Sequence, residues 1–306
     1  MNKKKGLALA AAFFAFSFAA PAFSQEGPLA MICGGGTLPL AVADSVSRRG
    51  RQVLLFVLRG AAEGTALERF PHHWVYIGQV GKFMRVARAA GCRDVVFIGS
   101  LVRPAIWQIH PDFKALMLLA RAAAAYRGGD NHLLSDMGRM LEQHGFRMVG
   151  AHEVAPEILV PEGALGRATP SERDRIDMAL GFDYLRAAGP FDVGQAVVVA
   201  NKQVIAVEAA EGTDQMLARV AELRKNGRVR TPSGTGVLVK AAKRGQDHRF
   251  DLPSIGPQTV ERVLAAGLAG IAVVAGETIM AEPERVAQAA DKANMFVIGA
   301  RAGNEP

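Results

Sequence analysis

Short apolar runs alternate with amphipathic stretches in the first half of the chain. The apolar runs are "LAMIC", "QVLLFVLRG", "WVYIG" and "DVVFIGS", and the stretches between them include "LAVADSVSRRG" and "QVGKFMRVARAAGCR". Continuous apolar runs are typical of strands buried on both faces, whereas the stretches between them have the apolar spacing of helices. Repeated strand–helix–strand units form parallel sheets with right-handed connections. The pattern predicts such a sheet, followed by two helices separated at Gly128-Gly129 and a last strand in "RMVGAHEV".

The pattern changes within residues 156–170, where prolines and a glycine interrupt it. Beyond them, "PSERDRIDMALGFDYLRAAG" predicts a helix with a serine N-cap, and "QAVVVANKQVIAVEAAEGTD" predicts a β-hairpin that turns at Ala200-Asn201-Lys202. The next helix, in "TDQMLARVAELRKNG", has Thr213 or Asp214 as its expected cap. We therefore expect an α/β fold with a parallel-sheet domain over residues 29–158 and a mixed domain with antiparallel pairs over residues 159–306.

The N-terminal segment has the composition of a leader. "MNKKKGLALAAAFFAFSFAAPAFSQEGPLA" places three lysines before an apolar run and then small residues, which is the order of a secretory signal. The apolar run is short for a membrane span. Three interpretations of residues 1–28 follow: a signal that is removed, an anchor on a membrane, or an extension upstream of a start at Met31.

Composition and charge narrow the class of partner. A net charge of +7 and a pI near 9.7 favour acidic partners, such as a phosphorylated ligand or an anionic membrane surface. Nucleic acid is disfavoured, because aromatic residues are only 7% of the chain and no recognition-helix, zinc-finger or RNA-binding motif is present. Cys33 and Cys92 lie at the ends of apolar runs, where cysteine packs as a small apolar residue; two cysteines form no disulfide framework or zinc site.

Glycines follow the first predicted strand, where a ligand phosphate can approach the backbone. In "GGGTLP", Gly35 and Gly36 come between a strand and a helix, so that backbone N–H groups and the helix dipole attract anions; a tight turn explains the glycines equally well. The motif lacks the third spaced glycine of dinucleotide-binding proteins, and Arg59 stands where those proteins have an acidic residue. Ser100 and Arg103, in "FIGSLVRP", follow another strand and are candidate ligand contacts or plain loop residues.

Acidic residues form a second group of candidates. Asp130, in "GGDNHLL", is either a helix cap or a carboxylate near a ribose or a metal ion. Glu208, Glu211 and Asp214 crowd the turn in "EAAEGTD", and like charges so close require a cation or N–H groups to compensate them. Glu208 follows an apolar run, so we expect its side chain to point into the protein or a cleft.

Basic residues surround one further carboxylate. Lys240 ends the strand "GVLVK", and "KRGQDHRFD" then leads to Asp251. A solvated loop accounts for this charge run, but a pyrophosphate site, with cations on the phosphate oxygens and Asp251 on Mg²⁺, accounts for both signs of charge. The chain has no G-x-S-x-G, Walker A or H-E-x-x-H motif, which favours attack by metal-activated water over a covalent intermediate.

Nine motifs in register resemble one family. They are "ICGGGTLPL", "GQVGKF", "FIGSLVRP", "GDNHLL", "GAHEV", "DVGQAVVV", "EAAEGTD", "VLVKAAK" and "RFDLPSIGP". Together they resemble the LpxI-type UDP-2,3-diacylglucosamine pyrophosphatases of lipid A biosynthesis, from about Leu29 to the C-terminus. The resemblance implies a Rossmann-like first domain, a second α/β domain and a ligand cleft between them.

The resemblance also implies a reaction and a site. The reaction is Mg²⁺-dependent hydrolysis of UDP-2,3-diacylglucosamine to UMP and 2,3-diacylglucosamine 1-phosphate. The family's essential aspartate, in its D-L-P-x-I-G motif, corresponds to Asp251. With the candidates named above, the predicted substrate-binding residues are Gly35, Gly36, Ser100, Arg103, Asp130, Gln195, Thr213 and Lys240, and the predicted metal ligands are Asp251, Glu208 and Asp214.

Two further functions and the location stay open at this point. A dinucleotide-dependent oxidoreductase would share the first domain, and an exported ligand-binding protein would share the two lobes and the leader. Members of the family generally start near Met31 and meet a substrate made on the cytoplasmic side. The resemblance therefore implies a cytoplasmic enzyme, peripheral on the inner membrane, with a periplasmic location as the alternative. A homodimer is compatible with the sequence and is not specified by it.

Overall fold

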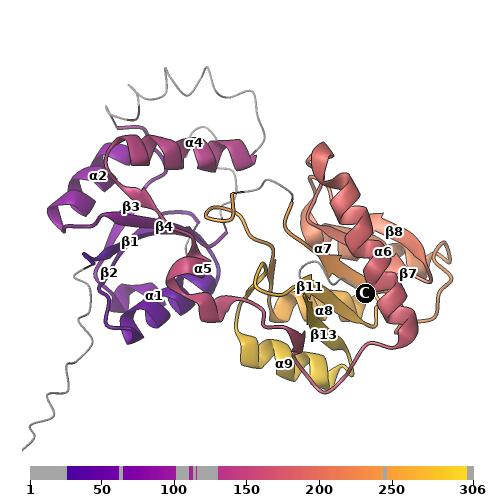
Figure 1. The fold of residues 1–306 in the computed structure, drawn as a ribbon. Helices are drawn as coiled ribbons and strands as arrows, with labels where there is room; N and C mark the ends of the chain where they lie inside the picture. Colours follow the sequence, from indigo (N-terminus) through magenta and orange to yellow (C-terminus); the bar gives the residue numbers. More distant parts are fainter. Residues whose placement is uncertain are drawn as a thin grey trace, which may run out of the picture.

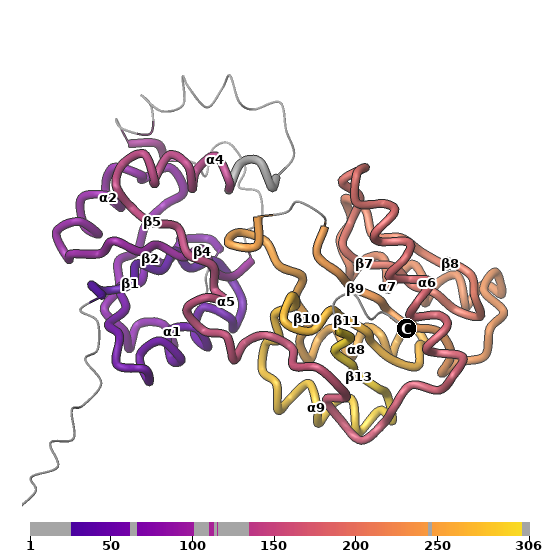
Figure 2. Tube along the Cα trace, viewed as in Figure 1, coloured from indigo at the N-terminus to yellow at the C-terminus, as the bar shows by residue number. Residues whose placement is uncertain are grey.

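A computed structural model describes residues 26–61, 65–100, 110–112, 115, 130–243 and 247–301. Two sheets, each covered by helices on both faces, form the two halves of the molecule (Figures 1 and 2). The predicted α/β class, with a parallel first sheet and a mixed second sheet, is confirmed. The leader and the first helix of the predicted pair before residue 130 lie largely outside the described residues.

The first sheet contains five parallel strands in the order β3-β2-β1-β4-β5. The strands are β1 (Leu29–Cys33), β2 (Val53–Leu58), β3 (His72–Val75), β4 (Asp94–Ile98) and β5 (Arg147–Met148). All six residues of β2 and most of those in β1 and β4 are buried. Burial on both faces explains why these runs are apolar throughout rather than alternating.

Helices cover the two faces of this sheet in separate layers (Figure 1). One layer contains α1 (Leu38–Arg48) and α5 (Ala151–Val154), and the other contains α2 (Val80–Ala89) and α4 (Asp130–Gln143). Short 3₁₀ turns, η1 (Thr65–Arg69) and η3 (Pro156–Ile158), complete the described part of this half. We refer to the apolar clusters under the two layers as the α1 core and the α4 core.

The second sheet has six strands in the order β6-β13-β11-β9-β7-β8. They are β6 (Gly163–Ala164), β7 (Ala196–Ala200), β8 (Gln203–Val207), β9 (Val237–Lys240), β11 (Gly270–Val274) and β13 (Phe296–Ala300). Its centre, β13-β11-β9, is parallel; β6 and β7 pair antiparallel with the two sides of this centre, and β8 pairs antiparallel with β7. The predicted hairpin is β7–β8, and its turn places Asn201 and Lys202 at φ of 52° and 62°.

Helix α6 packs against one face of the second sheet, and three other helices pack against the opposite face. The helices are α6 (Glu172–Ala188), α7 (Gly212–Lys225), α8 (Pro257–Ala265) and α9 (Pro283–Lys292), with a 3₁₀ turn, η4 (Gly189–Phe191), after α6. The predicted serine cap of α6 is confirmed: the Ser171 hydroxyl accepts a hydrogen bond from Asp174 N, and the Asp174 carboxylate accepts one from Ser171 N.

Two local predictions were wrong. In "RMVGAHEV" the strand ends at Met148 and helix α5 follows, because the Glu153 carboxylate accepts the Gly150 N–H and starts a helical turn. Helix α7 begins at Gly212 with Glu211 in the cap position, so neither Thr213 nor Asp214 caps it. The Thr213 hydroxyl instead bonds a side chain described below.

The two cysteines are buried free thiols, as their apolar surroundings predicted. Burial raises the pKa of Cys33 to about 12, and burial also raises the pKa of Cys92. None of the helices in the described part of the chain is long and apolar enough to cross a membrane.

The segment after residue 247 joins the two halves. It contains β10 (Ser254–Ile255), which pairs in parallel with β12 (Ile279–Met280). Ile279 belongs to the α1 core of the first half, although it lies beyond β11 in the sequence. Figure 1 shows this orange segment between the two sheets. A connection of this kind places Asp251 at the junction of the halves.

Candidate functional site

Asp251 lies at the junction and is held by a side chain of the second half. The amide Nε2 of Gln195 donates to Asp251 Oδ2 over 2.9 Å. Gln195 directly precedes β7, and its carbonyl accepts a hydrogen bond from Ala241 N at the end of β9. Since β7 and β9 are neighbouring strands, the sheet fixes the place of the amide that orients the carboxylate.

A continuous series of hydrogen bonds extends from Gln195 to a buried lysine. Gln195 N donates to Glu208 Oε2 over 2.9 Å, and the Thr213 hydroxyl donates to Glu208 Oε1 over 2.9 Å. Lys240 Nζ lies 3.2 Å from Thr213 Oγ1 and donates to the Ser254 carbonyl over 2.9 Å. We call Gln195, Glu208, Thr213, Lys240 and Asp251 the polar network. The expectation that Glu208 points inward agrees with these contacts.

Lys240 is the most buried member of the polar network, with 7% of its surface exposed. Burial lowers the pKa of its ammonium below the usual value, and the negative charges of Glu208, Asp214 and Asp251 act in the opposite direction. Asp214 itself is exposed in the first turn of α7. The three carboxylates therefore favour the charged form of the Lys240 side chain and partly offset the effect of its burial.

Gly194 makes the close approach in this network sterically feasible. A Cβ at this position would lie 2.5 Å from Cβ, Cγ and the carbonyl oxygen of Glu208. The Gly194 N–H donates to that carbonyl over 2.9 Å. The glycine of "DVGQAVVV" is therefore required for the side chain of Glu208 to pass beside the chain and reach Gln195.

Gly35, Gly36 and Ser100 meet at the carboxyl edge of the first sheet. Gly35 and Ser100 exchange two backbone hydrogen bonds, of 2.8 and 2.9 Å, as an isolated antiparallel bridge. A Cβ on Gly35 would lie 2.5 Å from the Ala61 carbonyl oxygen and 2.9 Å from Ser100 Oγ. Gly36 has a φ of 89°, with open space around its Cα. The edge is thus built by close contact between backbones, at the side of the sheet where open α/β folds bind ligands.

Two predicted ligand contacts cannot be placed. Arg103 lies outside the described residues. Asp130 is the first residue of α4, and its side chain also lies outside the described part of the chain. Their predicted roles stay predictions, as does the proposed cleft between the domains.

The carboxylates of the polar network fit one mode of Mg²⁺ binding. Among the described residues, no group of three or more His, Cys, Asp and Glu side chains is placed to hold a metal ion. Mg²⁺ in phosphoryl-transfer sites commonly takes one or two carboxylates, with phosphate oxygens and water completing the octahedron. Asp251, which is half-buried and carries two carboxylate oxygens, fits that mode of binding. The predicted roles of Glu208 and Asp214 as metal ligands stay predictions.

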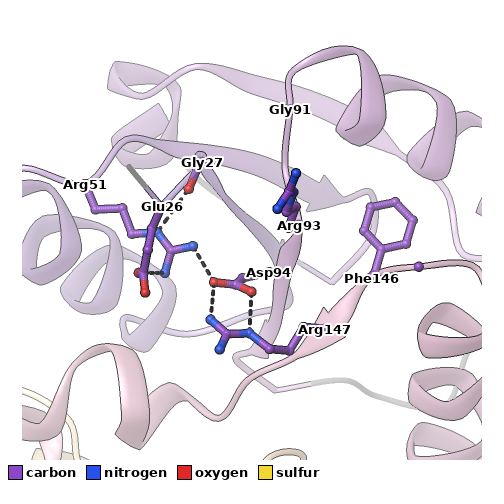
Figure 3. A pocket seen from close by; sticks show the side chains of 9 residues that line it. Glu26, Gly27, Arg51, Gly91, Arg93, Asp94, Phe146 and Arg147 are labelled. Carbon is purple, nitrogen blue, oxygen red and sulfur yellow. Dashed lines mark hydrogen bonds and ion pairs between the residues drawn. The ribbon is translucent and has the colours of Figure 1, made fainter. Parts of the chain in front are cut away.

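A cavity at the opposite edge of the first sheet has a structural explanation. Its volume is about 660 Å³, and Asp94, Arg51 and Arg147 lie along it (Figure 3). Asp94 is buried and accepts hydrogen bonds from both arginines, at 2.6 to 2.8 Å, which lower the pKa of its carboxyl below the usual value against the opposing effect of burial. The ion pairs join the amino ends of β4 and β5 to the loop before β2, and no motif in the sequence had indicated them.

The comparisons with known proteins define the class. The chain belongs to the LpxI family: models of the LpxI N-terminal domain and the LpxI C-terminal domain match residues 28–158 and 161–298. The resemblance inferred from the nine motifs is therefore confirmed.

One relative and one solved structure are similar to the chain to very different degrees. The chain is 41% identical over 271 residues to UDP-2,3-diacylglucosamine pyrophosphatase LpxI of Caulobacter vibrioides. The aligned region covers 89% of this chain and 96% of the relative. It also matches the biotin carboxylase domain of Hydrogenobacter thermophilus 2-oxoglutarate carboxylase at 12% identity, over 68% of this chain and 42% of that one. The TM-score of 0.24 for that structure is too low to support any conclusion about fold or function.

Proposed function

We propose that this protein hydrolyses the pyrophosphate bond of UDP-2,3-diacylglucosamine to UMP and 2,3-diacylglucosamine 1-phosphate, with Mg²⁺ as cofactor. Membership of the LpxI family and the 41% identity to a pyrophosphatase with that substrate in its name support the reaction. The observation that carries the proposal for this chain is the polar network, in which Asp251 is bonded by Gln195 next to the buried cation Lys240.

The residues of the network have separate roles in the proposed reaction. Gln195 orients the Asp251 carboxylate. This carboxylate would hold Mg²⁺ and orient the attacking water at the phosphorus atom. Glu208 and Thr213 fix the ammonium of Lys240, which attracts the phosphate oxygens of the substrate. Donors that are fixed before the substrate arrives need no reorganisation during the reaction, so they stabilise charge that develops in the transition state.

Asp251 is the proposed protein ligand of Mg²⁺, with phosphate oxygens as the further ligands, and Glu208 and Asp214 supply negative charge nearby. When bound, Mg²⁺ neutralises charge on the phosphate oxygens and lowers the pKa of a water ligand. The carboxyl edge at Gly35, Gly36 and Ser100 is the proposed contact for another part of the substrate, through backbone N–H groups.

The experiment is release of UMP from UDP-2,3-diacylglucosamine by the purified chain in Mg²⁺, measured by chromatography. We expect turnover by the wild type and its loss when EDTA removes the metal, with recovery on addition of excess Mg²⁺. A purified, folded chain that binds the nucleotide sugar and releases no UMP would contradict the proposal and favour a binding protein. Turnover that survives EDTA would contradict only its metal dependence.

A further inference from the structure

The residues on either side of Asp251 reach into the other half of the molecule. Phe250 packs against the α4 core, where its ring lies 6.0 Å from that of Phe97 on β4. Leu252 packs against the α1 core. These two cores lie on opposite faces of the first sheet, so the segment that carries Asp251 straddles the edge of that sheet.

A glycine inside α4 makes room for Phe250. A Cβ on Gly138 would lie 2.2 Å from Cζ of Phe250, and 2.8 and 3.2 Å from its two Cε atoms. Glycine in the interior of a helix destabilises it by about 0.5–1 kcal/mol relative to alanine. Helix α4 therefore carries an unfavourable residue at a point where the Phe250 ring of the other half lies against its backbone.

An ion pair on the same helix adjoins this contact. Arg249 Nη1 lies 2.7 Å from Glu142 Oε1, and Glu142 is four residues after Gly138, hence on the same face of α4. The guanidinium of Arg249 lies 5.3 Å from the centroid of the Phe250 ring and also bonds Asp247. Arg249 and Phe250 thus hold to α4 the turn that directly precedes Asp251.

The two halves therefore hold different parts of Asp251. The first half holds the chain on either side of it through Phe250 and Leu252, and the second half holds its carboxylate through Gln195. We propose that Phe250 and Gly138 form a positioning contact, which sets Asp251 against Gln195 and makes turnover depend on the docking of the two halves. This inference rests on the proposed function for its kinetic test.

The first test is Gly138→Ala. The new methyl group displaces the Phe250 ring, and misplacing a catalytic group by about 1 Å can lower a rate about 100-fold. We expect kcat to fall by about 10- to 100-fold with KM changed less than about threefold, while the helix itself gains stability from alanine. Arg139→Ala, at the neighbouring exposed position, is the matched control and should leave kcat unchanged. Wild-type kcat in Gly138→Ala would overturn the proposal.

A second substitution decides whether Gly138 acts through Phe250. Leucine at position 250 keeps an apolar side chain and removes the outer ring atoms that meet the new methyl group. The double variant Gly138→Ala/Phe250→Leu should therefore recover at least about fivefold in kcat over Gly138→Ala alone. A double variant no more active than Gly138→Ala would refute the contact as the cause.

Hydrogen exchange tests the anchor without any substrate. In Phe250→Ala, the amides of residues 250–252, 254 and 255 should exchange at least about 10-fold faster than in the wild type, while those of the second sheet stay unchanged. Unchanged exchange in residues 250–255 would contradict the anchor. If the wild type releases no UMP, the proposed function fails, and the exchange experiment still decides whether Phe250 holds the segment.

Discussion

The ligand is expected at two places, of which one is formed by backbone contacts and the other by side-chain hydrogen bonds. At the carboxyl edge of the first sheet, Gly35 and Ser100 meet through their backbones. In the second half, hydrogen bonds of five residues connect Asp251 to Lys240, and all but the one from Gln195 N to Glu208 join two side chains. The first place depends on the absence of side chains, and the second depends on the identity of each one.

The two places are therefore suited to different tasks, the first to binding an anion and the second to the reaction. A backbone edge offers N–H groups to any anion of the right form and performs no proton transfer. The polar network contains the carboxylates and the ammonium that can respond to charge on a reacting group. Substitutions at the glycine edge should therefore act mainly on folding and binding, and substitutions in the network mainly on turnover.

The largest expected effect is that of Asp251→Asn. The amide can still accept a hydrogen bond from Gln195 but supplies no negative charge, so kcat should fall by at least about 10³-fold with the fold retained. The measurement is UMP release at saturating substrate, with circular dichroism as the test of folding. Asp183→Asn, exposed on α6, is the matched control. Wild-type turnover in Asp251→Asn would show that the Asp251 carboxylate, and with it the polar network, is not required for the reaction.

Lys240→Met should lower kcat by about 10²-fold, because it removes the cation and keeps the length of the side chain. The same assay measures it, and Lys225→Met, at the exposed end of α7, controls for loss of a positive charge alone. An equal loss of activity in both lysine variants would show that net charge rather than the buried ammonium is required, and wild-type activity in Lys240→Met would show that the ammonium is not required.

Gly35→Ala should act on stability. Its methyl group meets the Ala61 carbonyl, a backbone atom that can move only with its chain, so we expect a loss of about 1–3 kcal/mol in the free energy of unfolding. Urea denaturation measures this quantity. The comparison is Gly256→Ala, where the nearest atom to the new Cβ would be 3.6 Å away and a smaller loss is expected.

The smallest expected effect concerns His152, which faces His248 across the junction with ring centroids 6.5 Å apart. Burial lowers the pKa of His152 below its usual 6.5, with His248 acting in the same direction and Glu153 and Asp247 opposing. The unfolded chain takes up this proton at a higher pH than the native one. Stability should therefore decline as pH falls from about 6.5 toward the native pKa.

Urea denaturation of the wild type and of His152→Gln, at about pH 7.5 and about pH 5.5, measures this effect. The wild type should lose more stability than the variant between the two conditions. Equal losses would show that the proton on His152 is not linked to folding.

The sequence was informative where one local rule decides the structure. Uninterrupted apolar runs predicted the buried parallel strands, and Ser171 predicted the start of α6. In "RMVGAHEV" the apolar pattern alone was insufficient, because the bond between Glu153 and Gly150 N selected a helix. Helix α7 begins at Gly212, one residue before Thr213, so the threonine does not cap the helix and its hydroxyl donates to Glu208 instead.

Contacts between distant residues were the part that could not be predicted. Motifs and family resemblance indicated Gln195, Lys240 and Asp251, but not that one amide joins Asp251 to the edge of β7. Phe250 was a single aromatic residue in a charged loop, and nothing local to "RFDLPSIGP" indicates Gly138 as its partner. The ion pairs of Asp94 were missed for the same reason, since Arg51 and Arg147 come from separate loops.

The state of the two thiols has a practical consequence for such experiments. Cys33, with a pKa of about 12, and the enclosed Cys92 hold almost no reactive thiolate at neutral pH. A maleimide dye should then attach selectively to a new cysteine at a solvent-facing position, such as Ser254, while both native cysteines stay in place. The surroundings of the segment beside Asp251 can then be followed by fluorescence with both native cysteines in place.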